Sequence, residues 1–79
     1  MNAREIAGKL GRMRREALLR LPVDGSFQVW ELNWLFRSEF LELELIEGFD
    51  DPRAGVEMKL YRLTPLGLEV RAILEESGK

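Results

Sequence analysis

Residues 46–63 most constrain what this chain can fold into. Two segments with strand patterning, residues 46–50 and residues 57–63, flank an Asp-Pro-Arg-Ala-Gly stretch at residues 51–55. Turn-forming residues between two such segments are typical of a β-hairpin with a longer loop. The sequence therefore predicts a hairpin over residues 46–63, with Tyr61 and Leu63 on the same side of the second strand.

A C-terminal helix is predicted directly after the hairpin, over residues 64–76. Thr64 is a favoured N-cap residue, and Pro65 occupies the first helical position, where its missing N–H is not needed. The buried face of this helix is expected from four apolar residues at helical spacing, namely Leu66, Val70, Ile73 and Leu74.

The first 21 residues are predicted to form one amphipathic helix. Asn2 and Glu5 have the spacing of a capping box, and Pro22 disfavours helix in the residue before it, so the helix should end near Arg20. Its buried stripe is expected from five residues at steps of three and four: Ile6, Leu10, Met13, Ala17 and Leu21.

Residues 26–45 are predicted to be a central helical segment. Residues 29–36 have the spacing of a helix, on which Trp30 and Trp34 form an i,i+4 pair. Burying both would make that helix apolar nearly all round, so one Trp is expected as an exposed anchor. A break is expected at residues 37–38. Residues 41–45 alternate like a strand but are Leu and Glu, which favour helix, and a short third helix is the preferred interpretation.

Length and composition predict one domain over residues 1–79, with 46% apolar and 33% charged residues. The chain has no Cys and no His, which excludes disulfides, thiolate zinc sites and the commonest general base. We therefore expect that the protein is not an enzyme and that it has no catalytic residues, no cofactor and no metal site. The apolar runs are too short to span a bilayer, which predicts a cytoplasmic protein without a membrane segment.

The predicted order of helix, turn, helix, short helix, hairpin and helix resembles a winged-helix domain. Residues 61–67 (Tyr-Arg-Leu-Thr-Pro-Leu-Gly) are similar to the junction between wing strand and helix in small bacterial winged-helix proteins. Residues 45–48 are similar to the segment that leads from the recognition helix into the wing. The resemblance spans about residues 9–74. It implies an α+β fold with three or four helices and a β-hairpin wing, and DNA binding through the third helix.

The distribution of charge departs from what DNA binding requires. Residues 1–20 carry six basic and two acidic groups, whereas residues 21–57 carry two basic and nine acidic groups. Carboxylates at the recognition-helix positions repel phosphates. The stretch is either a solvated face or a docking surface for a basic protein. The candidate partner-binding residues are Glu31, Trp34, Glu39, Glu42, Glu44, Glu47, Asp50 and Asp51.

The preferred hypothesis is a protein-binding inhibitor whose acidic face imitates the charge of DNA. In size, charge and architecture the chain is similar to the small phage-encoded anti-CRISPR proteins. That resemblance implies a basic nucleic-acid-binding protein or a CRISPR effector complex as partner, in the host bacterial cell, with no direct nucleic-acid contact. A monomer or weak dimer is expected. The alternatives are a winged-helix transcriptional regulator, using the basic first helix and the wing, and a plain adaptor.

Overall fold

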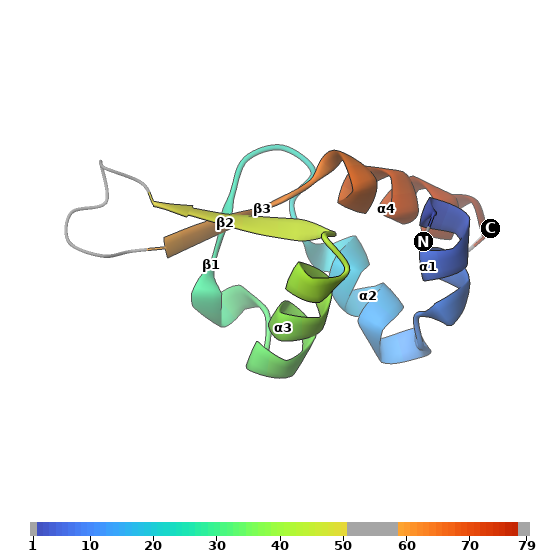
Figure 1. Cartoon of the computed structure of the whole chain (residues 1–79), viewed down its shortest axis with the longest axis horizontal. Coiled ribbons are helices and arrows are strands. Elements are labelled where there is room, and N and C mark those ends of the chain that lie inside the picture. The colour runs from blue at the N-terminus through green and yellow to red at the C-terminus, as the bar shows by residue number, and fades with distance from the viewer. Residues whose placement is uncertain (1, 51–58, 78–79) are drawn as a thin grey trace.

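The computed structural model describes residues 2–50 and 59–77 (Figure 1). Within these residues the elements are α1 (Ala3–Lys9), α2 (Arg12–Arg20), β1 (Phe27–Gln28), the 3-10 turn η1 (Val29–Glu31), α3 (Trp34–Glu42), β2 (Ile46–Asp50), β3 (Lys59–Leu63) and α4 (Pro65–Ser77). The predicted α+β class is confirmed, and the arrangement is compatible with a small winged-helix-like domain.

The three strands form an antiparallel sheet in the order β1-β3-β2. Ile46 pairs with Leu63 and Phe49 with Leu60, so the predicted strands of the hairpin are confirmed where they are described. The predicted turn at residues 51–55 and the start of the second strand at 57–58 lie outside the described residues. Strand β1 was not predicted, because two residues are too short to show a period.

The prediction of a single N-terminal helix is wrong, because the chain breaks between α1 and α2. Leu10 and Gly11 both have extended backbones, with ψ of 128° and 169°. Glycine is a poor helix former, and Gly11 becomes the N-cap of α2. The break changes which residues face inward: Leu18 is fully buried, whereas Met13, expected in the core, is 71% exposed.

The predicted boundaries in the central segment are also wrong. Residues 29–31 form a 3-10 turn, and α3 then runs from Trp34 through residues 37–38, where a break was expected. Asn33 explains the start, because its Oδ1 accepts a hydrogen bond from the N–H of Phe36 at 2.9 Å. The two tryptophans therefore do not share one helix, and Trp34 begins α3.

No separate third helix follows, since residues 43–45 instead close the C-terminus of α3. The N–H of Leu45 donates to the carbonyl of Phe40 at 2.8 Å, and the N–H of Glu44 donates to that of Leu41 at 3.1 Å. This pair of bonds is a Schellman motif, and it holds Glu44 at φ 61°, where glycine is usually found. The chain thereby turns directly from α3 into β2.

The predicted start of the C-terminal helix is confirmed. The Thr64 hydroxyl accepts a hydrogen bond from the N–H of Gly67 at 3.0 Å and donates to the carbonyl of Glu44 at 2.5 Å. Gly67 is needed here, because a Cβ at this position would lie 2.0 Å from the Leu45 carbonyl oxygen. The first turn of α4 is thus fastened to the end of α3.

The core lies between the sheet and the helices. Its fully buried side chains come from separate elements and include Leu18 of α2, Phe27 of β1, Phe40 of α3 and Val70 of α4. Phe27 stacks on Tyr61 of β3, with the ring centres 5.9 Å apart. Figure 1 shows α1, α2 and α4 grouped together, α3 beneath the start of the hairpin, and the strands extending away from the helices.

Candidate functional site

The outward side of α3 is mainly apolar. Phe40 is buried in the core and Phe36 is half-buried, while the opposite side exposes Trp34, Leu35, Ser38, Leu41 and Glu42. Trp34 is 69% exposed. We call these five exposed residues the outer face of α3. The preceding turn η1 adds two further exposed apolar residues, Val29 and Trp30, so that large apolar side chains follow one another over a short length of chain.

Both tryptophans are exposed, although sequence reasoning expected one to be buried. The exposed fraction of Trp30 equals that of Trp34. The two residues lie on separate elements, so a single helical face does not have to accommodate both. Sequence reasoning also missed Leu35 and Leu41 as exposed residues. Two signals together could have found them: Asn33 marks the start of the helix, and with Phe36 and Phe40 on its inner side, helical spacing places both leucines away from that side.

Two basic residues at α3, Arg37 and Arg14, are bonded within the domain. Arg37, the one basic residue in α3, donates through Nη1 to the backbone carbonyls of Val29 at 2.9 Å and Leu32 at 3.4 Å. Its guanidinium therefore braces η1 against α3. It is not directed outward as it would be to contact a phosphate.

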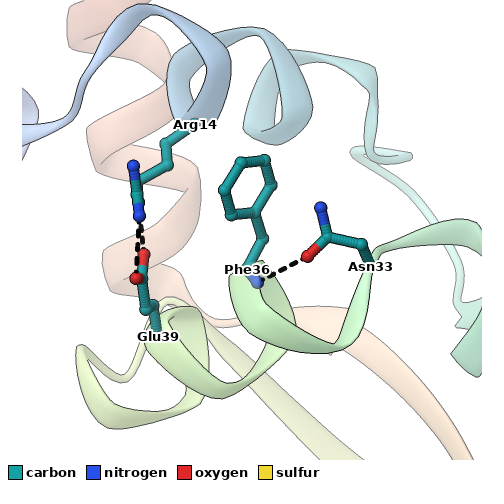
Figure 2. Close-up of polar contacts among 4 residues, drawn as sticks. All are labelled: Arg14, Asn33, Phe36 and Glu39. Carbon is teal, nitrogen blue, oxygen red and sulfur yellow. Dashed lines mark hydrogen bonds and ion pairs between the residues drawn. The ribbon is translucent and has the colours of Figure 1, made fainter.

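Arg14 of α2 forms a two-bond ion pair with Glu39 of α3 (Figure 2). One of the bonds joins Arg14 Nη2 to Glu39 Oε1 at 2.9 Å. The guanidinium also lies over the Phe36 ring, 5.0 Å from its centre. The hydrogen bonds with Arg14, and then its positive charge, lower the pKa of Glu39, while the bonds with Glu39 raise the pKa of Arg14. Glu39 therefore joins two helices and is not a free carboxylate.

Two further predicted site residues have partners within the domain. The Glu31 carboxylate accepts a hydrogen bond from the N–H of Gln28 at 2.7 Å, which caps η1. Glu47 on β2 pairs with Arg62 on β3 at 2.5 Å, and Arg62 in turn lies over the Phe49 ring. Both acids remain exposed, but part of their capacity to bind a partner is already used.

The other predicted acids are divided between two places. Glu42 and Glu44 are exposed and lie close together at the C-terminal end of α3. Asp50 is exposed at the far end of β2, and Asp51 lies outside the described residues. The structure therefore brings Glu42 and Glu44 to the apolar outer face of α3, whereas Asp50 is separated from them by the length of a strand.

The outer surface of α2 differs in character. Its exposed residues are mostly charged: Arg12, Arg15, Glu16 and Arg20, with Met13 among them. Arg12 and Glu16 form an i,i+4 ion pair at 3.5 Å. In residues 2–50 and 59–77, no three side chains of the kinds that bind metals come together. No helix in the same part of the chain is long and apolar enough to cross a bilayer.

The comparisons with known proteins do not assign a family to this chain. No family model, no curated protein and no solved structure matches this chain.

Proposed function

We propose that this chain is a non-enzymatic, winged-helix-like protein-binding domain that inhibits a nucleic-acid-binding partner. The observation that carries the proposal is the outer face of α3. It exposes Trp34, Leu35 and Leu41 beside Glu42, while Arg37 of the same helix is bonded to backbone carbonyls. Exposed aromatic and aliphatic anchors with a charged rim are typical of protein interfaces.

The same face argues against reading of duplex DNA by α3. In a winged-helix domain this helix would enter the major groove and present Arg, Asn or Gln to base edges. Among the exposed residues of α3, only Ser38 and Glu42 are polar, and the carboxylate repels phosphates. A protein surface is the better complement to large apolar side chains.

The charge of the rim indicates the kind of partner. Glu42 lies at the C-terminal end of the outer face of α3, and Glu44 follows it in the turn after the helix. A complementary surface is an apolar patch bordered by Lys or Arg, and basic borders of this kind surround sites that bind nucleic acids. The chain would act by covering such a site, without cofactor or metal. The resemblance to small phage-encoded anti-CRISPR proteins makes a CRISPR effector complex in a host bacterial cell the first partner to test.

The test is a phage-survival assay in a CRISPR-competent host, combined with capture of the effector complex on the tagged protein. The wild-type chain should protect the phage and retain the complex, and the Trp34→Ala, Leu41→Ser variant should do neither. Met13→Ala is the matched control, because Met13 is as exposed as Trp34 but lies on α2. Nanomolar, sequence-dependent binding of duplex DNA in a gel-shift assay would contradict the proposal.

One observation favours the alternative of a transcriptional regulator. Arg15 and Arg20 of α2 are exposed, and no ion pair of either is seen in the described part of the chain. These residues could contact phosphates. In that case the Arg15→Glu, Arg20→Glu variant would lose DNA binding, while substitution of Trp34 would have little effect on it.

A further inference from the structure

A hollow of about 360 Å³ lies where the end of α3, the start of β2 and the start of α4 meet. Apolar residues from all three elements line it, namely Leu41, Ile46, Pro65 and Leu66. Glu44 and Glu47 contribute two exposed carboxylates to the same lining. The hollow therefore combines an apolar surface with negative charge, and it shares Leu41 with the outer face of α3.

The walls of the hollow are held by hydrogen bonds that do not depend on a ligand. The Thr64 hydroxyl bonds to the Glu44 carbonyl and to the N–H of Gly67, and the N–H of Thr64 donates to the Leu45 carbonyl at 3.0 Å. Because Thr64 makes these bonds within the domain, the carboxylates are the main polar groups that the hollow offers to a partner. A preformed site of this kind needs little ordering on binding.

The two carboxylates are able to bind one more cation. Glu44 is exposed at the left-handed turn after α3. Glu47 already pairs with Arg62, but the bond is made through Oε1, and the Glu47 side chain remains 47% exposed. A carboxylate has lone pairs for several donors, so Oε2 can accept from a second guanidinium.

We propose that this hollow receives an arginine side chain of the partner protein. The methylene stem of arginine would pack on Leu41 and Leu66, and its guanidinium would reach Glu44 and Glu47. Long basic side chains commonly bury their stem on apolar surface while the charged end stays polar, and the planar guanidinium matches carboxylates. A purely apolar side chain would instead take water from the carboxylates without replacing their hydrogen bonds.

This inference deepens the proposed function and rests on it, because the partner is the same basic protein. The hollow adjoins the outer face of α3, so one partner would contact both. It assigns to Glu44 and Glu47 a specific task, which is to hold a single arginine, in place of a diffuse imitation of the charge of DNA.

The experiment uses the full chain and three acetylated, amidated tripeptides: Gly-Arg-Gly, Gly-citrulline-Gly and Gly-norleucine-Gly. Citrulline keeps the shape of arginine without its charge, and norleucine keeps only an apolar stem. In an NMR titration, Gly-Arg-Gly should shift the resonances of Leu41, Glu44, Glu47 and Leu66. The citrulline and norleucine peptides should bind about twofold to fivefold more weakly, the range expected for loss of an exposed ion pair.

Variants identify the site of binding. Glu44→Gln should weaken binding of Gly-Arg-Gly, whereas Glu76→Gln, which removes an exposed carboxylate near the other end of α4, should not. Equal binding of the citrulline and arginine peptides would overturn the proposal. So would an equal loss in the Glu44 and Glu76 variants, since that indicates diffuse attraction.

The peptide titration is independent of the proposed function, because it needs no partner protein. If the peptide does not bind at the hollow but Trp34→Ala still abolishes partner binding, only the arginine site is wrong. If the peptide binds there but Trp34→Ala leaves partner binding intact, the outer face of α3 is not the interface, and the proposed function is wrong in that respect.

Discussion

Helices α2 and α3 pack against one core, but the surfaces that they expose to solvent differ in chemical character. The exposed side of α2 carries arginines and a glutamate, partly paired with each other. The exposed side of α3 carries Trp34, Leu35 and Leu41, and its one arginine is bonded inside the domain. Water hydrates the charged side chains of α2, whereas a cluster of exposed tryptophan and leucine side chains is typical of a surface that another molecule covers.

The difference shows that net charge alone does not locate a binding surface. The acidic middle of the chain includes carboxylates that cap η1, join α2 to α3 and pair across the hairpin. Those groups have structural partners. In the described part of the chain, the outer face of α3 instead exposes Trp34, Leu35 and Leu41 to solvent, together with Glu42.

The largest expected effect is on the free energy of unfolding, and it distinguishes the buried side of α3 from the exposed side. Phe40→Ala should lower the free energy of unfolding by about 3–5 kcal/mol, because Phe40 is fully buried and its loss leaves a cavity. Trp34→Ala should change the free energy of unfolding by less than about 0.5 kcal/mol, since Trp34 is an exposed surface residue. Urea denaturation measures both. A large destabilisation by Trp34→Ala would mean that Trp34 supports the fold and is not available as an anchor.

The next prediction concerns affinity for the partner and compares a substitution on the outer face of α3 with one on the exposed side of α2. Trp34→Ala should weaken binding by about thirtyfold or more, which corresponds to an interface anchor of about 2 kcal/mol. Arg15→Ala on α2 should change affinity by less than about threefold, as expected for a residue outside the contact. Calorimetric titration with the captured partner gives both values. The opposite ranking would move the interface to α2.

Sequence reasoning predicted the second half of the fold better than the first. The hairpin strands and the Thr64-Pro65 helix start depend on local turn and cap chemistry, which is visible in the residues themselves. The break at Gly11 and the start of α3 at Asn33 also have local signals, a poor helix former and an N-cap, but the helical spacing of apolar residues continues across both and concealed them. An error of phase then reverses inside and outside, as it did for Met13.

The site was predicted only in part for the same reason. Trp34, Glu42 and Glu44 are exposed as predicted candidates, with Trp34 at the start of α3 and the two acids at its end. Glu31, however, is used in a local cap with the N–H of Gln28, and Glu39 depends on its tertiary partner Arg14. Leu35 and Leu41 were missed, because apolar residues in a helix are by default assigned to the core.

A smaller effect concerns the acidic border of the outer face of α3. Glu44→Gly should raise the free energy of unfolding by up to about 1 kcal/mol, because glycine adopts the left-handed conformation at φ 61° without the Cβ penalty. Binding of the partner and of Gly-Arg-Gly should nevertheless weaken, since the carboxylate is lost. Glu44→Gln separates the two effects by keeping the backbone cost and removing only the charge. A gain in stability with unchanged binding would show that Glu44 has no part in the interface.

The smallest effect tests the Arg14–Glu39 pair that joins α2 to α3. Because the folded-state pKa of Glu39 is lowered, the pair contributes stability above the unfolded pKa of a glutamate, about 4.3, and this contribution is lost as the pH falls through the folded-state value. Glu39→Gln should therefore be less stable than the wild type at pH 7, and the difference should shrink in acid. Urea denaturation between pH 7 and pH 3 measures it.

A double-mutant cycle with Arg14→Gln isolates this pair from the other carboxylates that titrate in the same range. At pH 7 the double variant should be no less stable than either single variant, because both substitutions remove the same interaction. The coupling energy should fall as the pH is lowered through the folded-state pKa of Glu39, because protonation removes the charge from the pair. A coupling energy near zero at pH 7 would mean that the ion pair contributes nothing and that packing of Arg14 over Phe36 joins the two helices.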